Sequence, residues 1–435
     1  MADPLDITVT SPRDWKYISE GGSSIVFSYV GPAHDSFGGT ALRLRKALLS
    51  SPLDSPSLVI PPVDDPDDPA IAFQHGVVAR VLPEEYLPRL EAVQVSRAWL
   101  EELAVLAETQ RPTERRAKDT IDLQRTRAVL ATDLVGGRVV AVEIKPKWGF
   151  LPSPTHLAPG TAPVKTTTCR FCMHAQVRGA RDADADPAHA YCPLDLFSGE
   201  PDRVRTALCA LWDTWVSSSG TTNNLRVFVH GHMVRPDATP TSIEALAAQL
   251  GLAGEFTLYT VRDAFVARVL PLLRETSVLR LLANLQRTLD PLDIEGLALL
   301  WSRAYASQEP GIALQTQSPD DGAPDASPLG AGLSDPTIDD WKEFLDVYFA
   351  KNAQMDHDHP DAADLKYYCV AYLLSATFKD CSLILRIPED GAGSITLIDL
   401  DVKPISRLAK WQQLDKEIVE GYKNAWKPRQ CIETK

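Results

Sequence analysis

Two lysines mark an unusual strand end in the motif EIKPKWGFLP (143–152). Lys145 and Lys147 follow an apolar run and stand two residues apart, so strand alternation puts both on one face. Pro146 lies between them and cannot donate to a sheet, which favours a sheet edge or the mouth of a pocket. Neighbouring ammonium groups repel each other unless an anion lies between them, so the spacing favours anion binding about as strongly as a solvated surface.

Two acidic segments add carboxylates. Asp380 lies on a connection between an expected helix and an expected strand, and Asp399 and Asp401 share a face where the strand 395–398 ends. Such carboxylates suit a hard cation such as Mg²⁺. Cations then recur at helical spacing at Lys403, Arg407 and Lys410. Each segment alone is typical of a surface, but together they provide the groups for phosphoryl transfer to a polyanionic acceptor.

The segment around RFCMH (170–174) allows two interpretations. On a helix, His174 and Arg178 lie four residues apart and share a face. Cys169 and Cys172 form a Cys-x-x-Cys pair, which suggests a zinc site. The possible further ligands nearby are His174, His189 and Cys192. A structural zinc site usually has two tight ligand pairs, and here the second pair is missing, so zinc is the less favoured interpretation.

A glycine-containing loop could bring backbone N–H groups close to phosphate oxygens. Gly21, Gly22 and Ser23 lie between two expected strands, where a hairpin turn is the simpler explanation. The loop matches neither a Walker A motif nor a dinucleotide fingerprint. Arg43 lies on the expected strand 41–44. Its side chain is expected either on the solvent-exposed face of an edge strand or in contact with a nucleotide phosphate.

Two amides and a guanidinium stand at the start of the expected strand 225–230. Asn223, Asn224 and Arg226 are suited equally to capping a turn and to binding a ligand.

The composition sets limits on the function. The 435 residues carry a net charge of −14, with 44% hydrophobic residues, which argues against a general nucleic-acid binder and against a disordered chain. Seven scattered cysteines favour reduced thiols over a disulfide framework. No secretory signal and no uncharged apolar run long enough for a membrane helix is found, so we expect a soluble, intracellular protein.

The elements that must position these residues are mixed. Strands are expected at 25–30, 41–44, 127–134, 139–144 and 225–230, with 127–134 and 139–144 joined as a hairpin. Helical periods occur at 84–108, 202–216, 241–250, 263–289, 338–351 and 361–377. Three polar stretches are expected to be flexible: 50–69, 179–187 and 307–336. The expected strands are concentrated in the N-terminal part of the sequence and the expected helices in the C-terminal part. This order predicts an α+β fold with two lobes.

Seven segments resemble, in the same order, those of the inositol-pentakisphosphate 2-kinases. They are EIKPKWGFLP (143–152), RFCMH (170–174), PLDLFSG (193–199), NNLRVF (223–228), LDIEG (292–296), KDCS (379–382) and IDLDVKP (398–404). The first string and the last pair are the most specific, and the sequence resembles fungal members. The resemblance implies a two-lobed, kinase-like α/β architecture with the nucleotide between the lobes. We expect an N-lobe at 1–134 and a C-lobe at 135–435, with an insertion at 307–336.

The resemblance also implies a reaction. Enzymes of this family use ATP and Mg²⁺ to phosphorylate the 2-hydroxyl of inositol 1,3,4,5,6-pentakisphosphate, giving inositol hexakisphosphate (phytate). By motif match, Asp380 would be the catalytic base, and Asp399 with Asp380 would hold Mg²⁺. Residues expected at the nucleotide are Gly21, Gly22, Ser23, Arg43 and Asp133. Residues expected at the inositide are Arg115, Lys145, Lys147, His174, Arg178, Asn223, Asn224, Arg226, Lys403, Arg407 and Trp411.

Departures from the family pattern carry their own expectations. Some members hold a structural zinc with a Cys-x-x-Cys soon after LDIEG, whereas 307–313 contains no cysteine, so we expect that zinc to be absent. Arg178 stands where other members carry Lys, and Trp411 stands where a phosphate-contacting Tyr is expected.

Two alternatives remain open. A catalytically idle inositol-polyphosphate-binding scaffold would keep the cations but lose an essential carboxylate. An inositol-phosphate kinase of another positional preference would differ only in pocket geometry. We expect a monomer that binds neither membrane nor nucleic acid; location in the nucleus or the cytoplasm rests on the resemblance.

Overall fold

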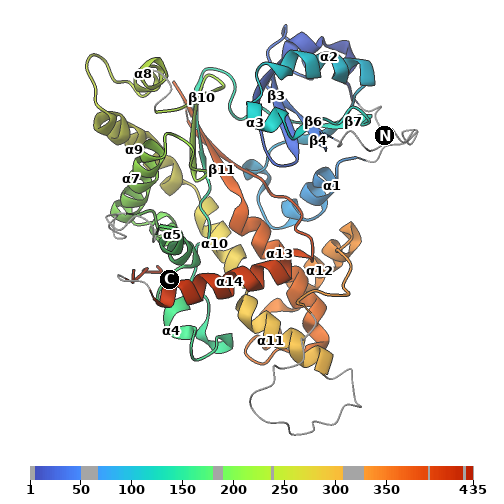
Figure 1. Cartoon of the computed structure of the whole chain (residues 1–435), viewed down its shortest axis with the longest axis vertical. Helices are drawn as coiled ribbons and strands as arrows, with labels where there is room; N and C mark the ends of the chain where they lie inside the picture. The colour runs from blue at the N-terminus through green and yellow to red at the C-terminus, as the bar shows by residue number, and fades with distance from the viewer. Residues whose placement is uncertain are drawn as a thin grey trace. The chain divides into compact units, whose positions relative to one another are not determined.

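The protein is a mixed α and β chain, as its computed structural model shows (Figure 1). The structure describes residues 5–49, 67–179, 190–236, 240–306, 328–389, 392–424 and 428–434. The three stretches expected to be flexible lie largely outside the described residues. Within the described residues, no helix is both long enough and apolar enough to cross a membrane.

The chain divides into two compact units. Unit 1 comprises 1–144, 219–264 and 383–398; unit 2 comprises 145–218, 265–382 and 399–435. The chain therefore passes from one unit to the other directly before Lys145, after Ser382 and before Asp399. The division into lobes at residue 134 stays a prediction.

Unit 1 contains two sheets. The first has the order β1-β5-β7-β4-β3-β2, with β6 paired to β4; β1 is parallel to β5 and the other described pairs are antiparallel. Its strands are β1 (Leu5–Asp6), β2 (Trp15–Glu20), β3 (Ser24–Tyr29), β4 (Thr40–Leu48), β5 (Leu90–Gln94), β6 (Asp119–Ile121) and β7 (Arg127–Thr132). Alternate residues such as Phe27 and Leu42 are fully buried against Trp99 and Leu100 of α2 (Arg97–Glu108), as a sheet covered by a helix requires.

The second sheet of unit 1 contains strands that the chain leaves directly before Lys145 and Asp399. Its order is β10-β9-β8-β11-β12, formed by β8 (Val139–Ile144), β9 (Leu225–Val229), β10 (His232–Val234), β11 (Ser382–Pro388) and β12 (Ser394–Ile398). Ile144 is paired with Leu225 on one side and with Leu383 on the other, so one end of β8 meets the starts of β9 and β11. The remaining helices of unit 1 are α1 (Pro69–Gly76), α3 (Thr113–Arg116) and α8 (Pro240–Gln249).

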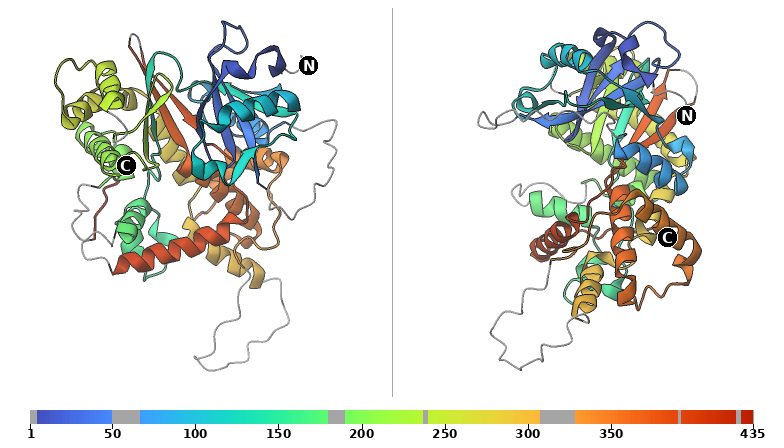
Figure 2. Two further views of the ribbon diagram at one scale, coloured as in Figure 1. Left: turned by 45° about the horizontal axis from the view of Figure 1, so that its top comes forward. Right: turned by 90° about the vertical axis from the view of Figure 1, so that its right-hand side faces the viewer.

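Unit 2 is helical in its described residues (Figure 2). Its helices are α4 (Ala162–Lys165), α5 (Arg170–Gly179), α6 (Pro193–Leu196), α7 (Pro201–Ser217), α10 (Val278–Thr288), α11 (Asp293–Ala306), α12 (Ile338–Lys351), α13 (Leu365–Asp380) and α14 (Arg407–Lys423). The helix α9 (Leu258–Glu275) begins in unit 1 and continues in unit 2. The helix α13 is buried along most of its length and packs against α10 and α11, while α14 packs against α5 and α11.

Three predicted elements were wrong. The strands β7 and β8 do not form a hairpin, because β7 pairs with β4 and β5 whereas β8 pairs with β9 and β11. The expected helix 84–108 is instead β5 followed by α2, since pairing with β7 overrides the helical period. The expected helix 263–289 is two helices, α9 and α10, separated at Thr276 and Ser277.

Candidate active site

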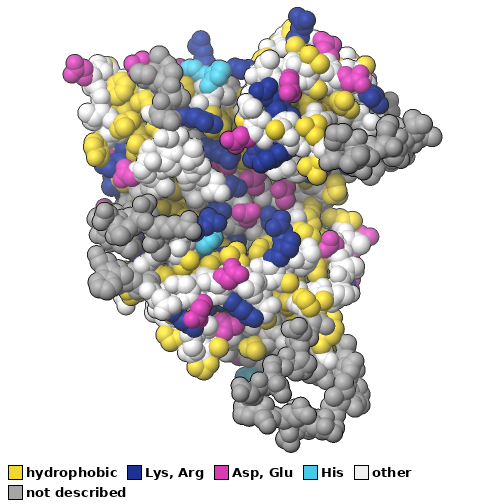
Figure 3. All heavy atoms as spheres, viewed as in Figure 1, with side chains coloured by type: hydrophobic (Ala, Val, Ile, Leu, Met, Phe, Trp, Pro, Cys, Tyr) yellow, Lys and Arg dark blue, Asp and Glu magenta, His cyan; other side chains and the backbone are white. Residues whose placement is uncertain are grey.

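Five predicted site residues of unit 2 take part in ion pairs. The Lys145 Nζ donates to Asp399 Oδ2 at 2.8 Å. The Asp380 carboxylate accepts from two ammonium groups, Lys147 at Oδ1 and Lys403 at Oδ2, each at 3.3 Å. Acidic and basic side chains are interspersed on the face of the molecule in Figure 3, as such pairing requires. These contacts form two ion-paired sets, and the charge of Lys145 also acts on Asp380.

The ends of neighbouring strands explain how this group forms. Lys145 follows the last residue of β8, Ser382 is the first residue of β11, and Asp399 follows the last residue of β12. The Ser382 hydroxyl donates to Asp399 Oδ2 at 3.1 Å. Asp380 is the last residue of α13, only two residues before Ser382. The end of α13 and the end of β12 therefore place Asp380 and Asp399 close to the same residue, Ser382.

The backbone at two of these residues is strained. Lys147 has φ of +66° and Asp399 has φ of +60°, in the left-handed region that non-glycine residues rarely adopt. Each such residue costs of order 1–3 kcal/mol and persists only when its surroundings hold it. The prediction that Lys145 and Lys147 share one strand face is wrong, because β8 ends at Ile144 and the chain turns before Lys147.

Gln286 holds this turn, and the sequence reasoning missed it. The side chain is fully buried on α10, and its Nε2 donates to the carbonyls of Lys147 at 3.0 Å and Phe378 at 2.9 Å. Its Oε1 accepts from the Gly149 N–H at 2.7 Å. One amide therefore fixes both the strained backbone at Lys147 and the end of the helix that carries Asp380. No sequence signal distinguishes this glutamine from others on helices.

The cations control the charge of Asp380. Burial alone would raise the pKa of Asp380, but the nearby charges of Lys147, Lys403 and Lys145 outweigh burial and hold the pKa below its usual value. Asp380 is thus an ionised hydrogen-bond acceptor at neutral pH, although 56% of its side chain is exposed. An ionised carboxylate can accept further hydrogen bonds and can ligate a hard cation.

The helix α5 brings His174 and Arg178 to the same electrostatic environment. His174 is half-buried and Arg178 is exposed, one helical turn apart. Burial lowers the pKa of His174, and the charges of Arg178, Arg170 and Lys147 lower it further. The imidazole is therefore neutral at pH 7 in this structure, among cations that would attract an anion.

The helix α14 carries two further predicted residues. Arg407 is its exposed first residue, and Trp411 is half-buried with its ring 6.0 Å from that of Tyr372. The substrate contacts of both residues stay predictions.

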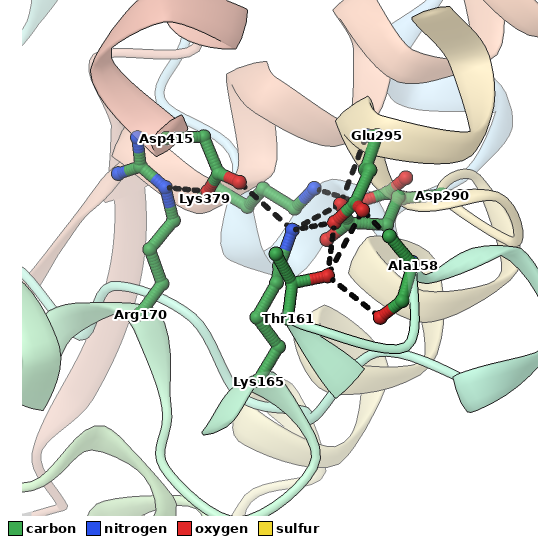
Figure 4. Close-up of polar contacts among 9 residues, drawn as sticks. Ala158, Thr161, Lys165, Arg170, Asp290, Glu295, Lys379 and Asp415 are labelled. Atoms are coloured by element: carbon green, nitrogen blue, oxygen red, sulfur yellow. Dashed lines mark hydrogen bonds and ion pairs between the residues drawn. The ribbon is translucent and has the colours of Figure 1, made fainter. Parts of the chain in front are cut away.

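A buried polar network in unit 2 joins the helices around the site (Figure 4). The Lys165 Nζ, on α4, contacts Asp293 at 2.5 Å, Asp415 at 2.8 Å and Glu295 at 3.6 Å. Arg170 of α5 donates to the other oxygen of Asp415 at 3.0 Å. These charges lie on α4, α5, α11 and α14, so the network fixes four helices to one another.

A second buried pair in Figure 4 involves Lys379, the residue before Asp380. Its ammonium contacts Asp290 at 2.5 Å and lies 4.1 Å from the centroid of the Trp148 ring. Lys379 belongs to KDCS, as Asp293 and Glu295 belong to LDIEG and Arg170 to RFCMH. Several residues of the quoted motifs therefore hold the frame of the site.

In unit 1, Arg226 pairs with a carboxylate. Its Nη1 lies 3.2 Å from Glu143 Oε2, between the paired strands β9 and β8. Asn223 and Asn224 directly precede β9. The end of β8 is therefore followed by Lys145, and the start of the neighbouring β9 is preceded by these amides.

The predicted nucleotide loop connects β2 and β3. Gly21, Gly22 and Ser23 are exposed. Gly22 and Ser23 line a cavity of about 590 Å³ whose walls include several ion-paired side chains, among them Arg45 with Asp68. Arg43 is half-buried on β4, and Arg115 is exposed on α3. The assignment of these residues to a nucleotide stays a prediction.

Asp133 has a structural task that the sequence reasoning missed. Its carboxylate is buried and accepts from the Ser28 hydroxyl at 2.6 Å and from the backbone N–H groups of Val135 and Gly136 at 3.1 and 2.8 Å. An added Cβ at Gly136 would lie 2.1 Å from Asp133 Oδ2, so the turn requires glycine there. Because the Asp133 carboxylate already accepts these three hydrogen bonds, we expect the backbone around Asp133, and not its side chain, to contact a nucleotide.

The sequence was compared with known protein families and proteins. Residues 17–417 match a family model described as inositol-pentakisphosphate 2-kinase. A protein named inositol-pentakisphosphate 2-kinase from Cryptococcus neoformans is 34% identical over 94% of this chain and 93% of its own length. A protein of the same name from Arabidopsis thaliana is 25% identical over 97% and 95%, and one from Oryza sativa is 24% identical over 94% and 93%.

Proposed function

Since the chain belongs to the inositol-pentakisphosphate 2-kinase family, we propose that it transfers the γ-phosphate of ATP to the 2-hydroxyl of inositol 1,3,4,5,6-pentakisphosphate, giving inositol hexakisphosphate. The product would then carry a phosphate on every ring oxygen. The family supports kinase chemistry on an inositol phosphate, and the positional detail is supported by the names of the relatives.

The single observation that carries the proposal is the Asp380 carboxylate held between the ammonium groups of Lys147 and Lys403. Five phosphates carry roughly −7 to −10 charges, so the substrate would take over these ammonium groups. Asp380 would then lose its hydrogen-bond donors at the point where the acceptor hydroxyl arrives. Its lowered pKa keeps it ionised in the free protein, and loss of the two ammonium partners would raise its basicity toward that of an ordinary carboxylate.

We propose that the inositide contacts are made by the residues that the resemblance assigns to them. They are Arg115, Lys145, Lys147, His174, Arg178, Asn223, Asn224, Arg226, Lys403, Arg407 and Trp411. Arginine forks and lysine point charges both suit phosphate oxygens, and the amides suit the remaining acceptors.

Magnesium fits the carboxylates at this site. Asp399 and Asp380 offer the oxygen ligands that Mg²⁺ prefers, and Asp399 is already placed by the Ser382 hydroxyl. When bound, Mg²⁺ neutralises charge on the phosphates during transfer. Asp399 would hold the ion, and Asp380 would assist while orienting the hydroxyl.

For the nucleotide, we propose a kinase-like arrangement of two lobes, divided near residue 134, with ATP between them. The loop Gly21–Ser23 would cover the phosphates with its backbone N–H groups, and Arg43 would contact them. The backbone around Asp133 would face the adenine, because the side chain is committed to its turn.

The test is product analysis with Mg-ATP and inositol pentakisphosphate for the wild type, Asp380→Asn, and the control Asp339→Asn on α12, whose side chain is 87% exposed. We expect hexakisphosphate from the wild type and the control, and a loss of about 10²–10⁴-fold in kcat for Asp380→Asn. Inositide binding by calorimetry should persist in Asp380→Asn. A wild-type chain that binds the inositide without making product would refute the kinase proposal, as would full activity of Asp380→Asn.

A further inference from the structure

Four charged side chains form a buried network beside the first sheet of unit 1. The Arg111 Nη2 donates to Glu20 Oε2 at 2.8 Å and to Asp119 Oδ1 at 2.6 Å. Lys46 forms ion pairs with the same two carboxylates, and its distance to Asp119 Oδ1 is 3.1 Å. All four side chains are between 2% and 9% exposed. The kinase chemistry proposed above gives none of them a task.

The charges of this network balance. Burial alone would raise the pKa of Glu20, but the hydrogen bonds from Arg111 and Lys46 outweigh burial and hold the pKa below its usual value. Burial would also raise the pKa of Asp119, and the same two cations lower it. Two anions therefore face two cations. Buried ion pairs add little net stability over apolar packing, but an arginine fork shared by two carboxylates fixes the direction of both.

The network joins the two ends of the predicted nucleotide loop. Glu20 is the last residue of β2 and directly precedes Gly21. At the other end of the loop, the backbone N–H of Lys46 donates to the Ser23 carbonyl at 3.1 Å. The side chains of Glu20 and Lys46 form an ion pair with each other. The base of the loop 21–23 is therefore held by two members of the network.

The same network joins the two ends of a second loop, which carries Arg115. The chain leaves the network at Arg111 and returns to it at Asp119, the first residue of β6. The Arg111 Nη1 also donates to the Asp119 carbonyl at 3.0 Å, so both the side chain and the backbone of Asp119 are held. The intervening residues 112–118 contain α3, which packs against β6 (Figure 1). One guanidinium thus contacts the base of both loops.

We propose that Arg111 is a positioning residue that couples the nucleotide loop 21–23 to the loop carrying Arg115. Its side chain is 2% exposed, so it acts through Glu20 and Asp119 and not by contact with a ligand. The inference rests on the proposed roles of the loop 21–23 at ATP and of Arg115 at the inositide. It adds that a ligand that orders one loop also orders the other, because both depend on the same guanidinium, and by linkage this coupling is reciprocal.

The variant Arg111→Lys tests this coupling while keeping the charge. Lysine can pair with one carboxylate but lacks the fork that holds both. We expect the KM for ATP and the KM for inositol pentakisphosphate each to rise about 10- to 100-fold, because both loops lose their fixed positions. We expect kcat at saturation to change less than about threefold, because Asp380 and Asp399 lie in unit 2. The matched control is Arg97→Lys on α2, whose ion pair with Glu101 is exposed and which should behave as the wild type.

The division of the effect between KM and kcat separates positioning from a loss of stability. A variant that only unfolds more readily contains fewer active molecules, so its apparent kcat falls while both KM values stay unchanged. That result for Arg111→Lys would overturn the proposal. A rise in the KM of one substrate alone would also overturn it, because the two loops would then be independent.

Hydrogen exchange of the wild-type protein tests the coupling without any variant. Mg-ATP added alone should slow amide exchange in residues 21–24 and also in residues 112–118, whereas α8, elsewhere in unit 1, should not change. Slower exchange in 21–24 alone would overturn the inference and leave the proposed nucleotide site standing. Unchanged exchange in both loops would refute the nucleotide assignment of 21–23, and the inference would fall with it.

Discussion

Replacing Lys165 with methionine tests whether the buried network holds unit 2 together. The Lys165 side chain is 3% exposed, and its ammonium is shared by Asp293, Asp415 and Glu295. Methionine keeps most of the volume of the side chain but leaves these carboxylates without their common cation. Removing one member of a buried ion pair costs about 3–5 kcal/mol, because the remaining charge stays buried. We therefore expect the free energy of unfolding to fall by about that amount at pH 7.5.

The pH dependence of this loss has a definite sign. Burial raises the pKa of Asp293 to about 6, even though Lys165 opposes the shift. A carboxyl whose pKa is higher in the folded chain than its ordinary 3.8 binds its proton more tightly when folded. Its contribution to stability is fully present below pH 3.8 and is lost as the pH rises through 6. Without Lys165 the pKa of Asp293 rises further, so the variant should lose less stability at pH 5 than at pH 7.5.

The assay is urea unfolding of the full-length protein, followed by far-ultraviolet circular dichroism at both pH values. The matched control is Lys423→Met, which removes an exposed ion pair with Glu420 and should change the free energy by less than about 1 kcal/mol. The double variant with Asp293→Asn should recover part of the loss, because it removes one stranded charge. A loss below about 1 kcal/mol for Lys165→Met, or an equal loss at both pH values, would refute the reasoning.

Two further predictions concern His174 and Gly296. An NMR titration should place the pKa of His174 below 6.5 in the free protein, because burial and neighbouring cations disfavour the imidazolium, and Arg178→Ala should raise it; a pKa at or above 6.5 in the wild type would contradict this account. Gly296→Ala would put a Cβ 2.4 Å from the His156 Cβ, so we expect thermal unfolding to show a loss of about 1–3 kcal/mol. Gly160→Ala, where no atom lies within 4 Å of the added Cβ, should be nearly neutral, and equal effects of the two substitutions would argue against the clash.

Local rules explain what could be predicted from the sequence. The bounds of α12 were predicted residue for residue, because Thr337 and Asp340 form a capping box directly before an amphipathic run. Lys145, Asp380 and Asp399 could be singled out because each stands at the end of a strand or helix or directly after it. These are short-range signals that the chain carries whatever its tertiary fold.

Long-range pairing explains what could not. The strands β7 and β8 are close in sequence and look like a hairpin, yet each finds its partners in a different sheet. Gln286 acts on residues far from it in the chain, and it does not stand in a motif that marks its task. The positive φ of Lys147 could not be predicted either. It depends on a tertiary contact with Gln286, and no glycine stands at this position to indicate a left-handed backbone.

The contact between Lys145 and Asp399 has a thermodynamic consequence for the proposed reaction. In the unliganded protein the ammonium group occupies the carboxylate that we assign to magnesium, so the ion must compete with it. An inositide phosphate offers Lys145 another partner and releases Asp399. Binding of the inositide would therefore make the binding free energy of magnesium more favourable. By linkage, magnesium would favour inositide binding by the same amount. Magnesium and substrate would then bind cooperatively, and the coupling would require only that the Lys145 side chain change its partner.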